Sequence, residues 1–237
     1  MKQLFSAIIF IAVLFLAPGC ILGPSIKGNG KVTDERRNIT GFNKLKTATG
    51  LDVSLIPDST EYVVVEADEN LHTTIKTELD GETLDIHADK QIRWAKSKKI
   101  TVHFSKLAGL RSTSGSSLSS LGIIHSNALE VTASSGARQH LEIDAEHLTG
   151  RSSSGAQVSL RGRATFTDLK ASSGAHLKGK DLEAIVCTAK VSSGAHIWIG
   201  VKNELDASAS SGGHIYYTGN PEKINVNTSS GGAIKKD

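Results

Sequence analysis

Ser172-Ser173-Gly174-Ala175-His176-Leu177 is the stretch that decides the fold of this 237-residue chain. The same Ser/Thr-Ser-Gly-small tetrad occurs seven times in the second half of the sequence. Its glycines are Gly115, Gly136, Gly155, Gly174, Gly194, Gly212 and Gly231, spaced 21, 19, 19, 20, 18 and 19 residues apart. A divergent copy begins at Thr47 and contains Gly50. Self-similarity at a nearly fixed period indicates a repeat architecture.

The residues beside each tetrad alternate between apolar and polar. Around Gly174, for example, Leu169 and Leu177 are apolar, whereas Lys170 is polar. An alternation of period two predicts strands with one buried face. If the alternation is unbroken, Ser173 also faces inward, where we expect its hydroxyl to bond a neighbouring coil. The glycine allows the chain to bend between two strands.

The repeat length selects among the known repeat folds. Helical repeats need about 33 residues or more, and propeller blades need about 40. Aromatic residues make up only 5% of the chain, which favours thin, closely packed layers. The sequence therefore predicts an all-β protein, a parallel right-handed β-helix (solenoid) of roughly nineteen-residue coils preceded by a less regular β-rich part.

One solenoid domain is predicted over residues 31–237, with irregular N-terminal coils over 31–106 and regular Ser-Ser-Gly repeats over 107–237. Asp80-Gly81, between two apolar runs, indicates a hairpin. A short helical turn is expected over Asn70–Ile75. The strand candidates of the irregular part are Leu51–Leu55, Tyr62–Glu66 and Ile100–Phe104.

The first residues have the pattern of a targeting segment. Residues 1–19 begin with a positive charge and continue through the apolar run Leu4–Ala17, which is too short to span a membrane comfortably. The small residue before Cys20 resembles a bacterial lipobox, which implies that Cys20 is diacylglycerol-modified. Residues 20–30 would then be a lipidated tether. A plain cleaved signal peptide and an uncleaved anchor are the alternatives.

The net charge and the second cysteine argue against nucleic-acid binding and against thiol catalysis. The formal charge is +3 without a basic block, so we expect no nucleic-acid partner. Cys187 lies in an apolar strand and is interpreted as a small buried hydrophobe, with a catalytic thiol as the alternative.

Three successive repeats carry histidine two residues after the glycine, followed two residues later by a large or charged side chain. We expect these side chains to stack on the outer surface about 4.8 Å apart. The functional interpretation is a ligand-binding strip with aromatic platforms, and the alternative is an exposed polar column without a role. A linear column does not converge on one tetrahedral zinc ion, so neither a metal nor another cofactor is expected. The strip residues are His176, Lys178, His196, Trp198, His214 and Tyr216.

Catalytic residues are not predicted. Glu130, Asp168 and Asp206 share one column on alternate coils, roughly 10 Å apart, and a solvated face explains them. A polysaccharide-active enzyme is nevertheless retained as an alternative, because solenoids can support catalysis.

The sequence resembles a known bacterial family. The resemblance rests on Gly28-Asn29-Gly30, on Ile39–Phe42 followed by Gly50–Val53, on Val63–Leu71 and on the Ser-Ser-Gly corners. These features are similar to the family of the putative auto-transporter adhesin, head GIN domain. The resemblance implies a β-helical lipoprotein or secreted protein, and it brings no catalytic residues with it.

Together these observations predict a non-enzymatic, adhesin-like binding scaffold in the bacterial cell envelope. It would be held at the periplasmic or surface face of the outer membrane by its lipid, with a glycan or an envelope protein as partner. The alternative is a structural or assembly component acting through the solenoid ends. We expect a monomer or an end-stacked dimer.

Overall fold

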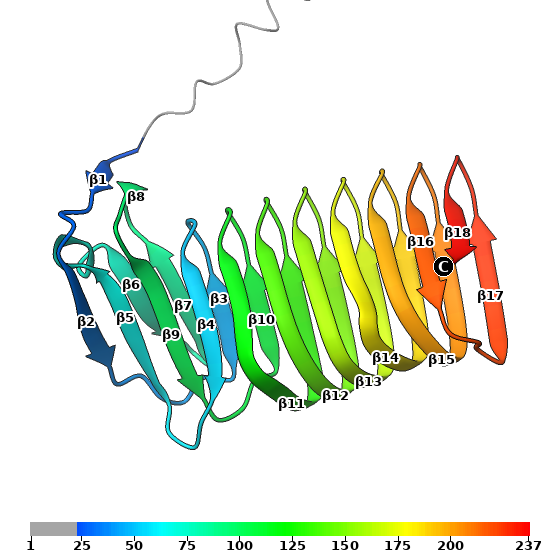
Figure 1. Cartoon of the computed structure of the whole chain (residues 1–237), viewed down its shortest axis with the longest axis horizontal. Coiled ribbons are helices and arrows are strands. Elements are labelled where there is room, and N and C mark those ends of the chain that lie inside the picture. Colours follow the sequence, from blue (N-terminus) through cyan, green and yellow to red (C-terminus); the bar gives the residue numbers. More distant parts are fainter. Residues whose placement is uncertain (1–22) are drawn as a thin grey trace, which may run out of the picture.

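The computed structural model describes residues 23–237, so the predicted signal peptide and Cys20 lie outside the described residues. The chain forms a row of β-coils, a solenoid of about seven turns (Figure 1), as the repeat predicted. In the described part, no helix is long and apolar enough to cross a membrane. The regular strands are β10 (Gly109–Ser112), β11 (Ser117–Ala133), β12 (Arg138–Ser152), β13 (Gln157–Ala171), β14 (His176–Val191), β15 (His196–Ala209), β16 (His214–Thr218), β17 (Lys223–Thr228) and β18 (Ala233–Lys236).

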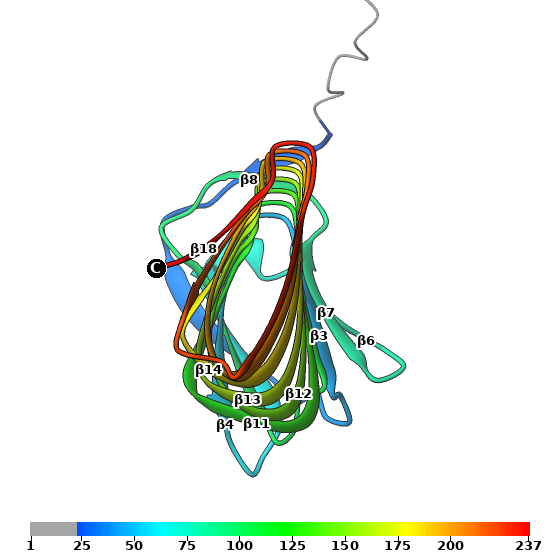
Figure 2. The ribbon, with the colours of Figure 1, turned by 90° about the vertical axis from the view of Figure 1, so that its right-hand side faces the viewer.

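Each coil is flattened, with two walls (Figure 2). Strands β11 to β15 each run along one wall, curve round the far edge and return along the other. The first wall follows each Ser-Ser-Gly turn and contains the starts of β11 to β15, then β16 and β18. The second wall precedes each turn and contains β10, the ends of β11 to β15, and β17. All of these strands pair in parallel with their neighbours.

The Ser-Ser-Gly tetrad forms a tight turn at the edge shared by the two walls. Ser173 has φ of 52° and Gly174 has φ of 68°. Two successive residues with positive φ define a type I′ turn, in which glycine is favoured at the second position. The turn is closed by a hydrogen bond from the Ala175 N–H to the Ser172 carbonyl at 3.1 Å.

The turns are also bonded to one another along the solenoid. The Gly174 N–H donates to the Ser193 carbonyl of the next turn at 3.1 Å, and the same bond recurs from Gly50 to Gly212. The divergent copy at Thr49-Gly50 therefore makes the same turn, with φ of 59° and 67°.

The expected inward orientation of Ser173 is wrong. This serine and its equivalents are exposed at the tips of the turns. The alternation of faces does not continue through a two-residue turn, because both central residues leave the strand geometry. The buried positions resume at Ala175, which is fully buried.

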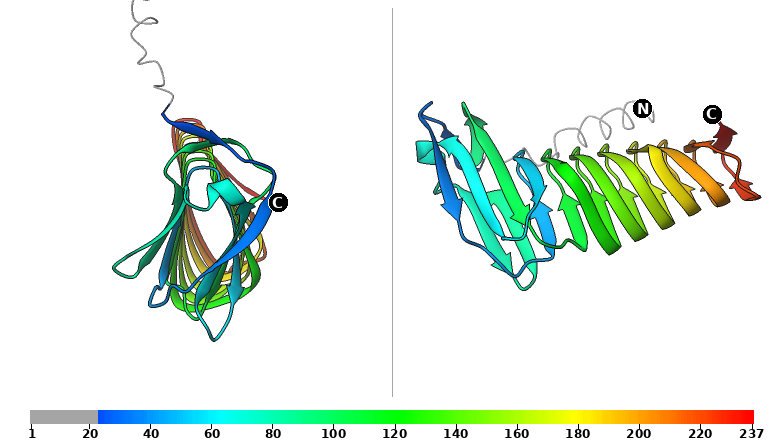
Figure 3. Two further views of the ribbon diagram at one scale, coloured as in Figure 1. Left: turned by 90° about the vertical axis from the view of Figure 1, so that its left-hand side faces the viewer. Right: turned by 60° about the horizontal axis from the view of Figure 1, so that its bottom comes forward.

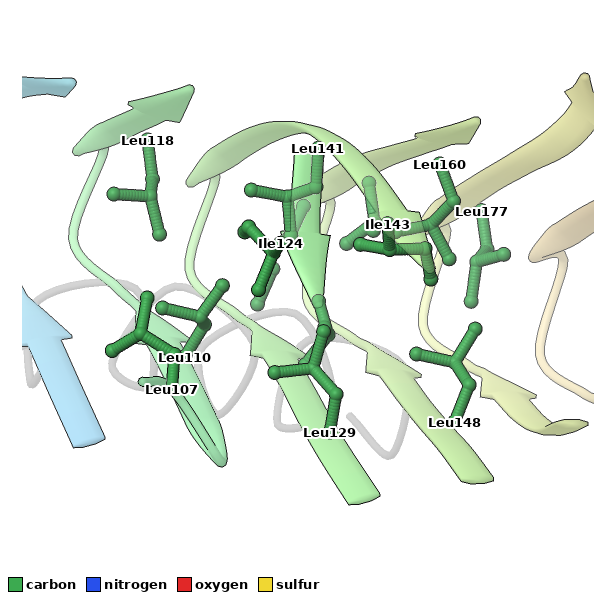
Figure 4. Packing of buried hydrophobic residues seen from close by; sticks show 14 of the residues in the cluster. Leu107, Leu110, Leu118, Ile124, Leu129, Leu141, Ile143, Leu148, Leu160 and Leu177 are labelled. Atoms are coloured by element: carbon green, nitrogen blue, oxygen red, sulfur yellow. The ribbon is translucent and has the colours of Figure 1, made fainter. Parts of the chain in front are cut away.

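The space between the walls is filled by stacked aliphatic side chains. Leu129 and Leu148 lie one above the other on adjacent coils, and Leu118, Leu141 and Leu177 cover them from the first wall (Figure 4). All five are at most 2% exposed. Deleting one such leucine would cost about 2–5 kcal/mol, because close-packed cores relax only partly around a cavity.

The N-terminal region is less regular, as expected. On the first wall, β9 pairs in parallel with β4, but β5 pairs antiparallel with β9, and β2 antiparallel with β5. On the second wall, β7 pairs with β3, and β6 and β7 form the predicted hairpin, which projects from the coils in Figure 2. The region consists of β1 (Ser25–Lys27), β2 (Val32–Arg37), β3 (Lys44–Thr47), β4 (Asp52–Pro57), β5 (Tyr62–Asp68), η1 (Glu69–Leu71), β6 (Ile75–Asp80), β7 (Thr83–Ala88), β8 (Gln91–Trp94) and β9 (Lys98–Phe104).

Part of the predicted tether is packed onto this end of the molecule (Figure 3). Strand β1 pairs with β8, so the folded part begins before residue 31. Asp68 is buried and holds the next segment: its carboxylate accepts hydrogen bonds from the backbone N–H groups of Gly30 at 2.7 Å and of Lys96 and Ser97 at 3.0 Å each. Burial opposes ionisation of Asp68, but bonds from Ser97, Gly30 and Lys96 outweigh it and lower its pKa.

Candidate functional site

The six predicted strip residues come together on the outer face of the first wall. The pairing of neighbouring strands places His176, His196 and His214 in one column across β14, β15 and β16. Lys178, Trp198 and Tyr216 form the adjacent column on the same strands. Residues two apart on a strand share a face, so each strand contributes one member to each column. We call these six residues the aromatic strip.

The rings of the aromatic strip are stacked along the solenoid axis. His196 and His214 have ring centroids 5.2 Å apart at 16°, and Trp198 and Tyr216 are 5.6 Å apart at 13°. His176 meets His196 edge-on at 82°, which ends the parallel stack on the β14 side. Offset aromatic pairs of this kind are mutually stabilising, so the strip is a preorganised surface.

His196 lies at the centre of the strip, and its surroundings favour the neutral imidazole. Burial lowers the pKa of its imidazole, and the nearby His176 and His214 lower it further because like charges repel. The Tyr216 hydroxyl lies 3.5 Å from Nδ1 of His214. The stacked rings of the strip therefore form an amphipathic surface with polar ring atoms, and Lys178 adds a positive charge at the β14 side.

A groove continues from the strip across β11 to β15. Trp198 and Lys178 line it together with polar residues of the lower coils, and its volume is about 570 Å³. Inside it, the Arg161 guanidinium donates to the Glu142 carboxylate at 2.6 Å, an exposed ion pair. Trp198 therefore lies where the strip meets the groove. The other polar groove residues include Ser119, His140, Ser159, Lys180 and Asp181.

Sequence reasoning missed the groove. His140 occupies the same column as Lys178 and Trp198, and extending that column to earlier repeats would have found it. Asp181 is harder to find, because the strand register between β13 and β14 shifts just before it, between Ser159 and Arg161. Counting from the glycine no longer aligns the coils beyond such a shift.

Metal binding has no support in the described chain. Residues 23–237 contain no group of three or more His, Cys, Asp or Glu side chains arranged to hold a metal ion. The three strip histidines are successive members of a straight column, a geometry that does not surround one ion.

The acidic columns on the outer surface are largely engaged in ion pairs. Asp168 accepts from Lys170 at 3.1 Å, and Asp144 accepts from Arg163 at 2.6 and 2.8 Å. The hydrogen bond from Arg163 lowers the pKa of Asp144 below its usual range. Asp144 is thus held as an ionised, paired carboxylate, unlike a general acid, whose pKa must be raised.

Cys187 is buried in β14 and forms no disulfide within the described residues. Burial, with a smaller contribution from Asp168, raises the pKa of its thiol to about 12. A neutral buried thiol is not a nucleophile, which supports its interpretation as a core residue. Cys20, the predicted lipidation site, lies outside the described residues.

The geometry defines a class of protein: a parallel β-solenoid with a preorganised aromatic surface and an adjoining polar groove on one wall. The chain belongs to the family described as putative auto-transporter adhesin, head GIN domain, whose sequence profile matches residues 41–221. The family was expected from the glycine corners and the N-terminal motifs, and that prediction is confirmed. Among curated proteins, no significant match was found.

Solved structures share the fold. A putative adhesin from Bacteroides fragilis has a TM-score of 0.83 at 19% identity, covering 90% of this chain and 100% of that chain. A putative adhesin from Parabacteroides merdae has a TM-score of 0.73 at 16% identity, covering 90% and 99%. A putative lipid binding protein from Parabacteroides distasonis has a TM-score of 0.71 at 20% identity, covering 90% and 99%.

The family description, putative auto-transporter adhesin, suggests a cell envelope or surface protein with a non-enzymatic role. At identities of 16 to 20%, the structural likeness itself establishes only the fold.

Proposed function

We propose that this protein is a lipid-anchored, non-enzymatic envelope protein that binds a glycan through the aromatic strip and the adjoining groove. The observation that carries the proposal is the stack of His196, Trp198, His214 and Tyr216, exposed in part on two adjacent strands, β15 and β16. Such rings contact the apolar faces and edges of sugars, and groove residues such as Arg161 supply hydrogen bonds to hydroxyls.

The position of the strip supports a role in display. Strand β1 begins five residues after Cys20 and packs at the N-terminal end of the solenoid (Figure 1). Along the first wall, β15 is eight strands from β2, which is roughly 38 Å at about 4.8 Å per strand. A lipid on Cys20 would hold the N-terminal end near the membrane and leave the strip at the distal end.

Glycan-array binding of residues 23–237 would test the proposal. The variant His196→Ala/Trp198→Ala/Tyr216→Ala is expected to lose at least about tenfold in affinity, because aromatic anchors dominate such surfaces. His147→Ala/Phe166→Ala is the matched control, since it removes a stacked His–aromatic pair, with centroids 4.9 Å apart, outside the strip. Equal binding by the triple variant and the unmodified protein would refute the proposal.

Assembly through the solenoid end is the second candidate. It is favoured by β17, in which Ile224 and Val226 are 49% and 51% exposed although their equivalents in earlier coils are buried. Replacing both with lysine should abolish any dimer measured by light scattering. A monomer at all concentrations in the unmodified protein would remove this candidate. A reducing-sugar assay on envelope polysaccharides checks the remaining alternative, catalysis.

A further inference from the structure

A second groove lies on the second wall, opposite the aromatic strip, and none of the features discussed above accounts for it. We call it the serine groove. It runs along the solenoid axis across the ends of β11 to β15 and onto β17, with a volume of about 580 Å³. Its principal lining residues are Arg151, Ser153, Lys170, Ser172, Lys190 and Ser192.

One side of the serine groove is a ladder of hydroxyl groups. In all seven Ser/Thr-Ser-Gly tetrads, the position two residues before the glycine is serine or threonine. Backbone bonds fix the spacing, as in Ser172 N–H to the Ser152 carbonyl at 3.0 Å. Within the described chain, the Ser134 hydroxyl bonds Thr113 at 3.3 Å, whereas those of Ser153, Ser172 and Ser192 have no side-chain partner. These three hydroxyls are available to a ligand.

The other side of the groove carries cations. Arg111, Arg151 and Lys190 occupy one column on β10, β12 and β14. Arg151 and Lys190 line the groove, and Arg111 continues the column just beyond it, in the neighbouring hollow that shares Thr132 with the groove. All three are exposed, and none forms an ion pair with a described residue. The two other cations of this column, Lys170 and Lys46, are paired with Asp168 and Asp85. Uncompensated cations therefore recur on alternate strands.

The described residues that line the groove include three cations, Arg151, Lys170 and Lys190, and no carboxylate. On the first wall, Arg161 and Arg163 are each bound to a carboxylate at 2.6 Å. Glu130 and Asp206 lie in the column next to the groove cations, but neither pairs with them within the described residues. A row of unpaired cations along a concave surface concentrates positive potential there.

The spacing of the cations indicates the shape of the ligand. Arg111 to Arg151 and Arg151 to Lys190 are each two strands apart, about 9.6 Å at about 4.8 Å per strand. This is close to the length of two sugar rings in an extended polysaccharide. The intervening serines match the positions of ring hydroxyls, which both donate and accept hydrogen bonds.

We propose that the serine groove binds a linear acidic polysaccharide with one carboxylate per two sugar rings, lying along the solenoid axis. Arg111, Arg151 and Lys190 pair with successive carboxylates, and the serine ladder bonds the hydroxyls between them. This site is independent of the proposed function, because it lies on the other wall and selects for charge.

Titration calorimetry of the full-length, detergent-purified protein with hyaluronan oligosaccharides, which carry one carboxylate per disaccharide, tests the proposal. Arg151→Gln/Lys190→Gln should weaken binding about tenfold, and raising the salt concentration should weaken it further. Ser172→Ala/Ser192→Ala should weaken it about threefold. The control Lys202→Gln/Lys223→Gln removes the same charge from cations that are paired with glutamates, and it should bind normally.

The proposal would be overturned by no binding of hyaluronan, by equal binding of carboxyl-reduced hyaluronan, or by an equal loss in the Lys202/Lys223 control. The strip variant His196→Ala/Trp198→Ala/Tyr216→Ala should keep its affinity for hyaluronan. A loss in that variant alone would assign the acidic glycan to the aromatic strip instead, and would also overturn the serine-groove proposal.

Discussion

The N-terminal region (β1 to β9) and the repeat region (β10 to β18) share one core but are stabilised differently. In the repeat region, the same turn and the same pairing recur coil after coil, so the stabilisation is divided among many equivalent bonds. In the N-terminal region, single groups hold several segments. Asp68 alone ties together the segments at Gly30 and Lys96-Ser97. Repetition spreads stability over the chain, whereas an irregular end concentrates it in a few residues.

Asp68→Ala should have the largest effect. It leaves three backbone N–H groups without their acceptor, and each buried unpaired amide costs about 1–3 kcal/mol, so we expect a loss of about 3 kcal/mol or more. Urea denaturation monitored by circular dichroism measures this change in the free energy of unfolding. Asp52→Ala, at an exposed carboxylate in β4, is the control and should change stability little. An equal loss in both variants would contradict the concentration of stability at Asp68.

Gly174→Val should break one turn of the repeat region. Valine is strained at a φ of 68°, at a cost of up to about 3 kcal/mol, although the position itself has open space for a side chain. Lys170→Val, on the outward face of β13, should stay within about 0.5 kcal/mol of the unmodified protein. Hydrogen exchange would show whether the damage stays near the altered turn. Equal stability of the two variants would mean that the turn geometry is not required.

Acid should destabilise the N-terminal region before the repeat region. The pKa of Asp68 is lowered in the folded state, so its stabilisation is complete above the ordinary aspartate pKa and is lost as the pH falls through the lower folded-state value. Hydrogen exchange at decreasing pH should show β5 and β8 losing protection before β12 to β14. Asp68→Asn should abolish this difference, since it cannot ionise. Simultaneous loss of protection in both regions would contradict the claim that the N-terminal region depends on the ionised Asp68.

The smallest effect is expected at the tip of a turn. Ser173→Asn should stabilise the protein by about 0.5 kcal/mol, because Asn-Gly is the preferred pair in a type I′ turn. Ser173→Ala is the matched variant and should be slightly destabilising, since alanine tolerates a φ of 52° less well than asparagine. Thermal unfolding of both variants measures the difference. The reverse order would show that the serine hydroxyl, not the backbone conformation, matters at this position.

The sequence was sufficient to predict the solenoid because its period, its glycines and its alternating faces are all local signals. It failed at Ser173, where the two-residue turn interrupts the alternation. Antiparallel pairing of β5 with β9 could not be predicted either, since an alternating pattern marks a strand but not its partner. For the site, counting from the glycine placed His196 and Trp198 correctly beside their neighbours. The same count reaches His140 in an earlier repeat, but it misses Asp181, which the register shift displaces by one residue.

The evenly spaced turn-to-turn hydrogen bonds have a mechanical consequence. A pull between the two ends of the solenoid loads the bonds of one coil boundary at a time, so the coils would peel away in sequence. Each released coil of about 19 residues adds roughly 65 Å of extended chain. Under tension, the repeat region would act as a set of nearly identical extensible links, lengthening in equal steps while the remaining coils stay folded.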